Sequence, residues 1–257
     1  MDHSDAAPHR NDATPHPTDA HPSGDDAARY WDSVYAGRPA PTDPRPNARL
    51  VETVTALPPG DALDLGCGGG GDALWLADRG WQVTALDVSA VATSRLARLA
   101  RARGLGNRIT ATPQDIRAAL PDLRFDLVNA HYFHTPYAQD RTAVLRSAAD
   151  LLRPGGRLLV VDHGSTAPWS WNQDPDVRYP TPREVVAPLR LSPTRWRVER
   201  ADMPHRIAVG PDGRTAEVID HVLLVRRTVT PLPPETSPPH HWPPPPAPGE
   251  PRALPPP

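Results

Sequence analysis

The chain contains a single cysteine, Cys67, no lysine and no long hydrophobic run among its 257 residues. A lone cysteine excludes a disulfide framework and a cysteine-cluster metal site within the chain. No apolar stretch approaches the ~20 residues that a helix needs to cross a bilayer, and the N-terminus lacks the charged-then-apolar pattern of a signal peptide. We therefore expect a cytoplasmic protein with no membrane partner.

An excess of basic residues is also missing. All 28 basic residues are arginine, 30 residues are acidic, and the formal net charge is −2. A near-neutral chain without a basic run is atypical of proteins that bind nucleic acid through its phosphates. The composition therefore predicts no nucleic-acid partner, and it leaves the choice between a monomer and a homodimer open.

Both ends of the chain differ in composition from its middle. Residues 1–27 are acidic and rich in histidine and proline, and residues 229–257 are dominated by proline. Such segments bury too little apolar surface to offset the entropy that ordering removes. We predict disordered tails at residues 1–27 and 229–257 around one folded domain at residues 28–228.

Short apolar strands alternate with helices through the middle of the chain. The expected strands are residues 62–65, 81–86, 108–111, 125–129 and 157–161, followed by 195–199 and 218–226. This alternation is typical of a parallel, doubly wound sheet with helices on both faces. The turn at residues 210–213 is too short for a crossover, so the last two strands should pair antiparallel. The prediction is a Rossmann-like α/β fold with a mostly parallel seven-stranded sheet and an antiparallel last strand pair.

A glycine-rich loop follows the first expected strand and leads into a helix. Gly66, Gly68 and Gly71 satisfy the G-x-G-x-x-G pattern, and Asp87 lies 21 residues after Gly66, as in NAD(P)-dependent oxidoreductases. Bare backbone amides at the start of a helix suit an anionic ligand. Asp64, at the entry of the loop, would instead repel a pyrophosphate and attract a ligand with positive charge. An oxidoreductase therefore stays an alternative, and Asp64 argues against it.

The segment Asp64-Leu65-Gly66-Cys67-Gly68-Gly69-Gly70 resembles the first motif of the class I S-adenosylmethionine-dependent methyltransferases. Their cofactor carries an ammonium and a sulfonium and has no phosphate, which agrees with the carboxylate of Asp64. Residues 125–128 and 152–156 also look like the family's fourth-strand and pre-fifth-strand segments. The resemblance covers roughly residues 28–228, and it implies a methyltransferase with S-adenosylmethionine as its cofactor.

The resemblance also implies which residues bind the cofactor. The backbone of Gly66 and Gly68 would approach its methionine and ribose part, and Asp64 would help to hold the ammonium side. Asp87 would accept hydrogen bonds from the ribose hydroxyls, and Asp115 would accept one from the adenine amine. Ile116 would lie beside the adenine ring, and His131 would face the transfer site. The expected set is Asp64, Gly66, Cys67, Gly68, Asp87, Val88, Asp115, Ile116 and His131.

A narrower resemblance concerns the acceptor. Tyr30-Trp31-Asp32, followed by Pro46-Asn47, resembles the small-molecule group that includes tellurite-resistance and thiopurine methyltransferases. Enzymes that methylate amino groups of DNA or glutamine carry an Asp/Asn-Pro-Pro-aromatic box after the fourth strand, where this chain has Asn129-Ala130-His131-Tyr132. The expected acceptor is a small molecule with a thiol, chalcogen, oxygen or nitrogen nucleophile. Trp31 is then either a flap over the ligand or a hydrophobic anchor for the domain edge.

The catalytic side chain does not follow from the sequence. Methyl transfer from a sulfonium can proceed largely through proximity and alignment. A hydroxyl or acid acceptor would gain from a base, and His131, His134 and His163 are candidates near the ends of the fourth and fifth strands. The favoured alternative for each is a packed residue that supports the site. His131 and His134 have loose metal-ligand spacing, but a third ligand is missing, so no metal is expected.

Residues 165–180 form a long aromatic loop after the fifth strand and include Trp169 and Trp171. These two tryptophans are candidates for a lid over the acceptor, and the alternative is a hydrophobic plug on the sheet edge. A cofactor-binding module without catalysis also stays open, because the proline-rich tail could dock in an aromatic groove of a partner protein.

Overall fold

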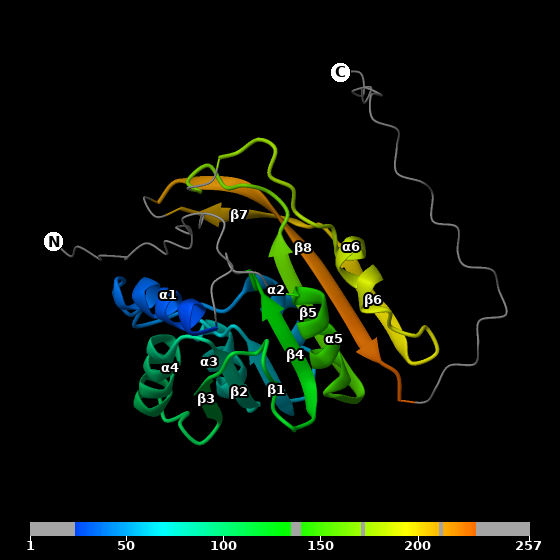
Figure 1. Ribbon diagram of the computed structural model, residues 1–257, viewed down its shortest axis with the longest axis horizontal. Helices are drawn as coiled ribbons and strands as arrows, with labels where there is room; N and C mark the ends of the chain where they lie inside the picture. The colour runs from blue at the N-terminus through cyan, green and yellow to red at the C-terminus, as the bar shows by residue number, and fades with distance from the viewer. Residues whose placement is uncertain (1–23, 135–139, 171–172, 211–212, 230–257) are drawn as a thin grey trace.

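Eight strands form one sheet in the computed structural model of the protein (Figure 1). The structure describes residues 24–134, 140–170, 173–210 and 213–229, so most of both expected tails lies outside the described residues. The sheet order is β3-β2-β1-β4-β5-β8-β6, and β7 pairs with β8 outside this path. The strands are β1 (Asp61–Leu65), β2 (Gln82–Asp87), β3 (Ile109–Pro113), β4 (Phe125–His131), β5 (Leu152–His163), β6 (Trp196–Asp202), β7 (His205–Val209) and β8 (Thr215–Arg227).

The helices cover both faces of this sheet. They are α1 (Gly24–Ala36), α2 (Ala48–Val54), α3 (Gly71–Asp78), α4 (Ala90–Ala102), α5 (Arg141–Asp150) and α6 (Pro182–Val186), with a short 3-10 turn at Ala187–Leu189. Strands β1 to β5 pair in parallel, whereas β8 runs antiparallel to β5, β6 and β7. The predicted doubly wound, mostly parallel sheet with antiparallel pairing at its end is confirmed. Helix α1 begins at Gly24, four residues before the expected start of the domain.

Strand β7 was not predicted from the sequence. The long strand β8 pairs with β6 through its second half and with β7 through its first half. Pro204 lies between β6 and β7 and has no backbone N–H with which to donate a hydrogen bond to a neighbouring strand. Two strands, β6 and β7, therefore precede β8, where only the strand at residues 195–199 was expected. The turn expected at residues 210–213 accordingly falls between β7 and β8, and its residues 211–212 lie outside the described residues.

Strand β5 is longer than predicted. Residues 153–156, which precede the expected strand at 157–161, belong to β5, and the register of β5 against β4 shifts between Phe125 and Leu127. Gly155 has a φ of 89°, a left-handed value that glycine adopts without a steric penalty. A turn-like sequence is therefore accommodated as an irregular strand start.

Two hydrophobic cores lie on the two faces of the sheet. One is formed with α2, α3 and α4, and the other with α5 and α6. Side chains alternate along a strand, and in β1 Ala62 belongs to the first core while Leu63 and Leu65 belong to the second. Asp64 therefore points to the same face as Ala62, toward α2, α3 and α4.

The start of α3 requires glycine. Gly70 has a φ of 80°, and a Cβ added to Gly71 would lie 2.2 Å from the carbonyl oxygen of Arg45. The segment before α2 thus lies directly against the glycine loop. The backbone N–H of Asn47 in that segment donates to Asp72 Oδ1 at 2.6 Å, which ties α2 to the first turn of α3.

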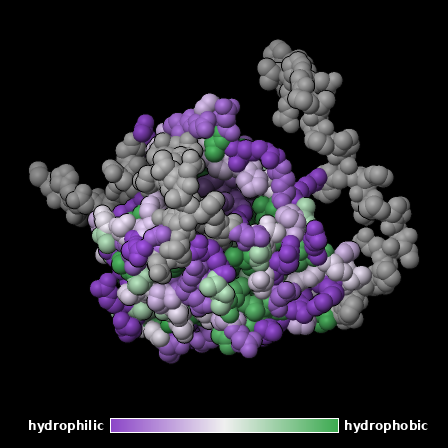
Figure 2. Space-filling view, in the orientation of Figure 1, coloured by the Kyte–Doolittle hydropathy of each residue, from purple (hydrophilic) through white to green (hydrophobic). Residues whose placement is uncertain are grey.

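On the face that Figure 2 shows, hydrophobic residues lie in patches between hydrophilic ones. Ile207 and Val209 of β7 are each 66% exposed. In the part of the chain that the structure describes, no helix combines the length and the apolar character that a membrane span requires.

Candidate active site

The glycine loop folds back over the end of β2. The backbone N–H groups of Gly66 and Cys67 both donate to the carbonyl oxygen of Leu86, at 2.8 and 3.0 Å. Gly66 and Gly68 have φ values of 70° and 49°, which favour glycine. The loop therefore presents bare backbone at the carboxyl edge of the sheet, where doubly wound folds bind ligands.

Asp87, at the end of β2, fixes this loop. Its Oδ2 accepts from the Gly68 N–H and its Oδ1 from the Ser89 N–H, each at 2.9 Å. Burial raises the pKa of Asp87, while the two backbone hydrogen bonds oppose the shift. Each carboxylate oxygen keeps a further lone pair. Asp87 can therefore accept hydrogen bonds from ligand hydroxyls while it holds the loop.

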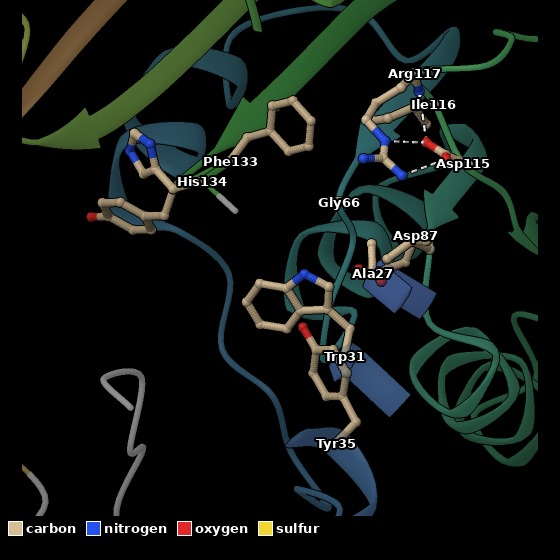
Figure 3. A pocket seen from close by; sticks show the side chains of 12 residues that line it. Ala27, Trp31, Tyr35, Gly66, Asp87, Asp115, Ile116, Arg117, Phe133 and His134 are labelled. Carbon is tan, nitrogen blue, oxygen red and sulfur yellow. Dashed lines mark hydrogen bonds and ion pairs between the residues drawn. The ribbon is translucent and has the colours of Figure 1, made fainter. Parts of the chain in front are cut away.

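A cleft of about 660 Å³, its open mouth included, lies at this edge of the sheet. Figure 3 shows Asp87 and Asp115 on one side of it and Phe133 and His134 on the other, with Trp31 between them. The lining residues are Ala27, Trp31, Tyr35, Gly66, Asp87, Val88, Asp115, Ile116, Arg117, Tyr132, Phe133 and His134. Five parts of the fold thus meet there: the ends of β1, β2 and β3, the loop after β4, and α1.

Asp115 forms an ion pair with Arg117 at one end of the cleft. Arg117 Nε donates to Oδ1 at 2.8 Å, and Arg117 Nη2 donates to Oδ2 at 2.7 Å. The hydrogen bonds from Arg117 lower the pKa of Asp115. Asp115 is therefore ionised at neutral pH and remains an acceptor, and the buried side chain of Ile116 lies next to it.

A second polar group lies behind the glycine loop. Asn129 Nδ2 donates to Asp64 Oδ1 at 2.6 Å, and His131 Nδ1 lies 2.7 Å from Asp72 Oδ2. Burial, followed by the negative charge of Asp72, raises the pKa of Asp64 well above its usual range. Positive charge brought close to this group would stabilise the ionised form of Asp64.

Three buried atoms of this group have no hydrogen-bond partner among the described residues, namely Asp64 Oδ2, Asn129 Oδ1 and His131 Nε2. Such atoms destabilise a fold unless a ligand or water satisfies them. Two of the three are acceptor oxygens, and one of these belongs to a carboxylate. A cationic N–H donor such as the ammonium of S-adenosylmethionine fits them, whereas a phosphate does not.

Helix α1 closes the side of the cleft. Asp32 Oδ1 accepts from Ser89 Oγ at 2.6 Å and from the Val91 N–H at 3.0 Å, which fastens α1 to the start of α4. Trp31 and Tyr35 stand one turn apart, with ring centroids 6.2 Å apart, and both line the cleft. Trp31 therefore has the position that a flap requires, and its effect on a ligand stays a prediction.

The three candidate histidines lie in different surroundings. His131 is buried behind the loop beside Asp72. His163 stacks on Tyr132 with ring centroids 4.2 Å apart, and burial, followed by the charge of His134, lowers the pKa of His163 to about 4. Of the three histidines, which are all among the described residues, His134 is the one that lines the cleft.

Tyr132 fixes the loop after β4 to the β7–β8 hairpin. Its φ of 47° is uncommon for a residue with a bulky side chain. Its hydroxyl donates to Asp220 Oδ1 at 3.0 Å and accepts from Arg206 Nη2 at 3.3 Å. Burial, followed by the charge of Asp220, raises the pKa of Tyr132 to about 12. The hydroxyl therefore stays protonated as a donor, and it anchors the loop that carries Phe133 and His134.

The candidate lid tryptophans do not share one position. Trp169 packs on Gly210, where an added Cβ would lie 2.6 Å from the indole ring. Trp169 is not among the residues that line the cleft, and its contact agrees with a plug on the hairpin. Trp171 lies outside the described residues, so its role stays a prediction.

Five of the nine residues expected at the cofactor line the cleft, and the other four lie behind it. The lining residues are Gly66, Asp87, Val88, Asp115 and Ile116, and those behind are Asp64, Cys67, Gly68 and His131. Sequence reasoning missed Tyr35, Asp72, Arg117 and Phe133. Tyr35 and Arg117 could have been found from the sequence. Tyr35 follows Trp31 by four residues, which is helical spacing, and Arg117 follows Asp115 by two, which is turn spacing. Phe133 had none.

Comparison with known proteins bears directly on this cleft. Residues 62–156 match the family described as a methyltransferase domain. This part of the chain is similar to a methyltransferase domain. The matched stretch contains the glycine loop, Asp87, Asp115 and the loop after β4, whereas the lining residues Ala27, Trp31 and Tyr35 of α1 lie outside it.

Curated relatives of the methyltransferase domain align with about half of the chain. The ubiquinone biosynthesis O-methyltransferase of Xanthomonas euvesicatoria pv. vesicatoria (strain 85-10) is 33% identical over 138 residues, which cover 52% of this chain and 56% of the relative. The ribosomal RNA small subunit methyltransferase C of Alcanivorax borkumensis (strain ATCC 700651 / DSM 11573 / NCIMB 13689 / SK2) is 31% identical over 147 residues, which cover 56% and 42%. The chain therefore spans about half the length of these relatives.

Solved structures share the fold of the methyltransferase domain over more of the chain. A structure described as "Conversion of a Disulfide Bond into a Thioacetal Group during Echinomycin Biosynthesis" is 27% identical, with a TM-score of 0.58 and coverage of 79% of this chain and 93% of that chain. TehB from Haemophilus influenzae is 18% identical, with a TM-score of 0.54 and coverage of 79% and 67%. The second likeness shows the fold alone.

Proposed function

We propose that the protein is an S-adenosylmethionine-dependent methyltransferase that acts on a small-molecule acceptor. The proposal rests on one observation: Gly66, Asp87 and Asp115 line the same cleft as the aromatic residues of α1 and of the loop after β4. The first set suits the cofactor, and the second leaves a place for an acceptor in the same cavity.

Different residues around the cleft bind different parts of the cofactor. When bound, the cofactor supplies a methyl group on a positively charged sulfur. Asp87 accepts from the ribose hydroxyls, Asp115 accepts from the adenine amine, and Ile116 packs beside the ring. Asp64 and Asn129 stabilise the ammonium group. Alignment of donor and acceptor in one cavity then supplies most of the catalysis.

A small-molecule acceptor is supported by the walls of the cleft. Helix α1 and the loop after β4 line the cleft with the aromatic rings of Trp31, Tyr35 and Phe133, of which Tyr35 and Phe133 lie against the glycine loop. The Xanthomonas relative is named for ubiquinone biosynthesis, whereas the Alcanivorax relative is named for ribosomal RNA. The formal net charge of −2 favours the first kind of acceptor.

Transfer of a labelled methyl group tests the proposal. The protein is incubated with labelled S-adenosylmethionine and a panel of thiols, phenols, carboxylates, amines and chalcogen oxyanions, and the label is followed into each acceptor. We expect transfer to at least one of them, with strong loss in Asp87→Ala. Binding of NAD by a protein that does not bind S-adenosylmethionine would instead support an oxidoreductase.

A further inference from the structure

We infer that His134, oriented by Asp162, is the general base of an acceptor site for aromatic hydroxyl compounds. The inference rests on the proposed methyltransferase function and names its acceptor class and its base. Two observations carry it: His134 lines the cleft, and its Nε2 lies 3.2 Å from Asp162 Oδ1 at the end of β5. His131 and His163 lie behind the lining residues, so neither competes for this role.

Asp162 is held so that it stays ionised. It is 2% exposed, and Arg141 Nη2 donates to its two oxygens at 2.6 and 2.8 Å. Burial alone would raise the pKa of Asp162, but the hydrogen bonds and charges of His134 and Arg141 bring it below its ordinary value. Because the ionised carboxylate of Asp162 can only accept a hydrogen bond, Nε2 of His134 must carry the hydrogen. The lone pair of the neutral ring is then on Nδ1.

The surroundings of His134 permit this lone pair to take a proton. Among the described residues, the titratable and charged groups around the ring are Asp162 and His163 of β5, Arg141 of α5, Tyr132 of its own loop and, across the cleft, Tyr35, Asp115 and Arg117. Asp162 stabilises an imidazolium, Arg141 is already paired with Asp162, and His163 is neutral at pH 7 because its pKa is about 4. The side chain of His134 is 44% exposed, so a proton can pass on to solvent.

The walls beside His134 suit a planar ring. Figure 3 shows Trp31 and Tyr35 of α1 across the cleft from Phe133 and His134. Aromatic side chains pack well against flat aromatic ligands. A phenol is mostly un-ionised at neutral pH and is then a weak nucleophile, whereas a thiol is a good nucleophile without help. A base among aromatic walls therefore points to a phenolic hydroxyl.

The step balances with the groups on hand. The acceptor oxygen forms the new C–O bond while the C–S bond to the methyl group breaks, and the electron pair of that bond stays with sulfur. His134 Nδ1 takes the hydroxyl proton, and Asp162 stabilises the imidazolium until the proton leaves to solvent. Base assistance of this kind contributes ~10²–10⁴-fold.

A series of substituted phenols tests the base. Transfer from labelled cofactor is measured for weakly acidic alkylphenols and for nitrophenols, which ionise unaided near neutral pH. In His134→Gln we expect kcat for alkylphenols to fall ~100-fold or more, kcat for nitrophenols to stay near the wild-type value, and the acid limb of the pH profile to disappear. Asp162→Asn should show a smaller loss with the same dependence on phenol acidity. His205→Gln is the matched control, because His205 is an exposed residue of β7 paired with Glu217.

Cofactor binding, measured by calorimetry on the same variants, separates the possible failures. If His134→Gln binds the cofactor and methylates alkylphenols at the wild-type rate, His134 is not the base. If the wild type methylates thiols and no phenol, the acceptor class is wrong while the proposed function stands. If the wild type does not bind the cofactor, the proposed function fails, and this inference fails with it.

Discussion

The two ends of the cleft are built in different ways. At the proposed cofactor end, Gly66, Asp87 and Asp115 follow three successive strands, and hydrogen bonds from backbone N–H groups of the loop to the end of β2 set its position. At the acceptor end, side chains from α1 and from the loop after β4 meet, and contacts between distant residues such as Tyr132 and Asp220 set their positions. Sequence motifs that follow the strands therefore specify the proposed cofactor end, whereas packing between residues far apart in the chain specifies the proposed acceptor end. Variants at one end should leave binding at the other largely intact.

The largest effect is expected for Asp87→Ala at the cofactor end. The variant removes the acceptor for the Gly68 and Ser89 N–H groups and for the ribose hydroxyls. Hydrogen bonds to a charged group contribute about 1.5–3 kcal/mol each, so we expect the cofactor Kd to rise ~100-fold. The acceptor KM, measured at saturating cofactor, should change little. Asp122→Ala, at a fully exposed carboxylate, is the control, and equal losses at both ends would contradict the division.

A somewhat smaller effect on binding is expected for Asp64→Asn, with an opposite effect on stability. Asp64 has a raised pKa in the folded protein, so its contribution to stability is present below its unfolded pKa and is lost as pH rises through the folded pKa. At neutral pH the variant should therefore unfold at the same or a higher temperature. Its cofactor Kd should rise ~10-fold or more, because the ammonium loses a buried carboxylate. A melting temperature well below that of the wild type would show that Asp64 is a structural residue.

The same carboxyl group should make cofactor binding depend on pH. A cation bound beside Asp64 favours its ionised form, so binding releases a proton wherever Asp64 is protonated in the free protein. Affinity should then rise with pH until the raised pKa of free Asp64 is passed. Calorimetry in buffers with different ionisation enthalpies measures the released proton, which should be absent in Asp64→Asn. An unchanged proton count in that variant would assign the pH dependence to another group.

Trp31→Ala should affect the acceptor end alone. Loss of one aromatic wall removes about 1–1.5 kcal/mol of ring packing, so we expect the KM of an aromatic acceptor to rise up to ~10-fold. The cofactor Kd should change less than about threefold, since this loss lies outside its contacts. Trp75→Ala is the control, because Trp75 lies on α3 beneath the Arg79 guanidinium and outside the cleft lining. A larger loss of cofactor affinity than of acceptor affinity would make Trp31 part of the cofactor site.

The smallest effect on function is expected for Trp169→Ala. The ring packs on Gly210 of the hairpin, so the variant should lower the free energy of unfolding by about 1–3 kcal/mol through lost packing. Cofactor Kd and acceptor KM should stay at wild-type values. Changed acceptor kinetics with unchanged stability would restore the lid interpretation of this residue.

The same contrast explains which parts of the fold and of the site could be predicted from the sequence. The fold and the cofactor end could be predicted, because the glycine motif, Asp87 and Asp115 are recognised by their positions directly after apolar strands. The pairing of His134 with Asp162 could not, because it depends on the register that places the ends of β4 and β5 side by side. Strand β7 escaped prediction because residues 205–209 were assigned to the connection between the expected strands 195–199 and 218–226, and the length of β5 because its glycines read as a turn.

The most direct test of the account is calorimetry of the full chain with S-adenosylmethionine, its demethylated product and NAD. Both the cofactor and its product carry the ammonium group that Asp64 and Asn129 are expected to hold, whereas NAD carries a pyrophosphate. We predict binding of the first two, weakened for both in Asp64→Asn, and no binding of NAD. Binding of NAD without binding of S-adenosylmethionine would contradict the central claim that the buried carboxylate selects a cationic ligand at the glycine loop.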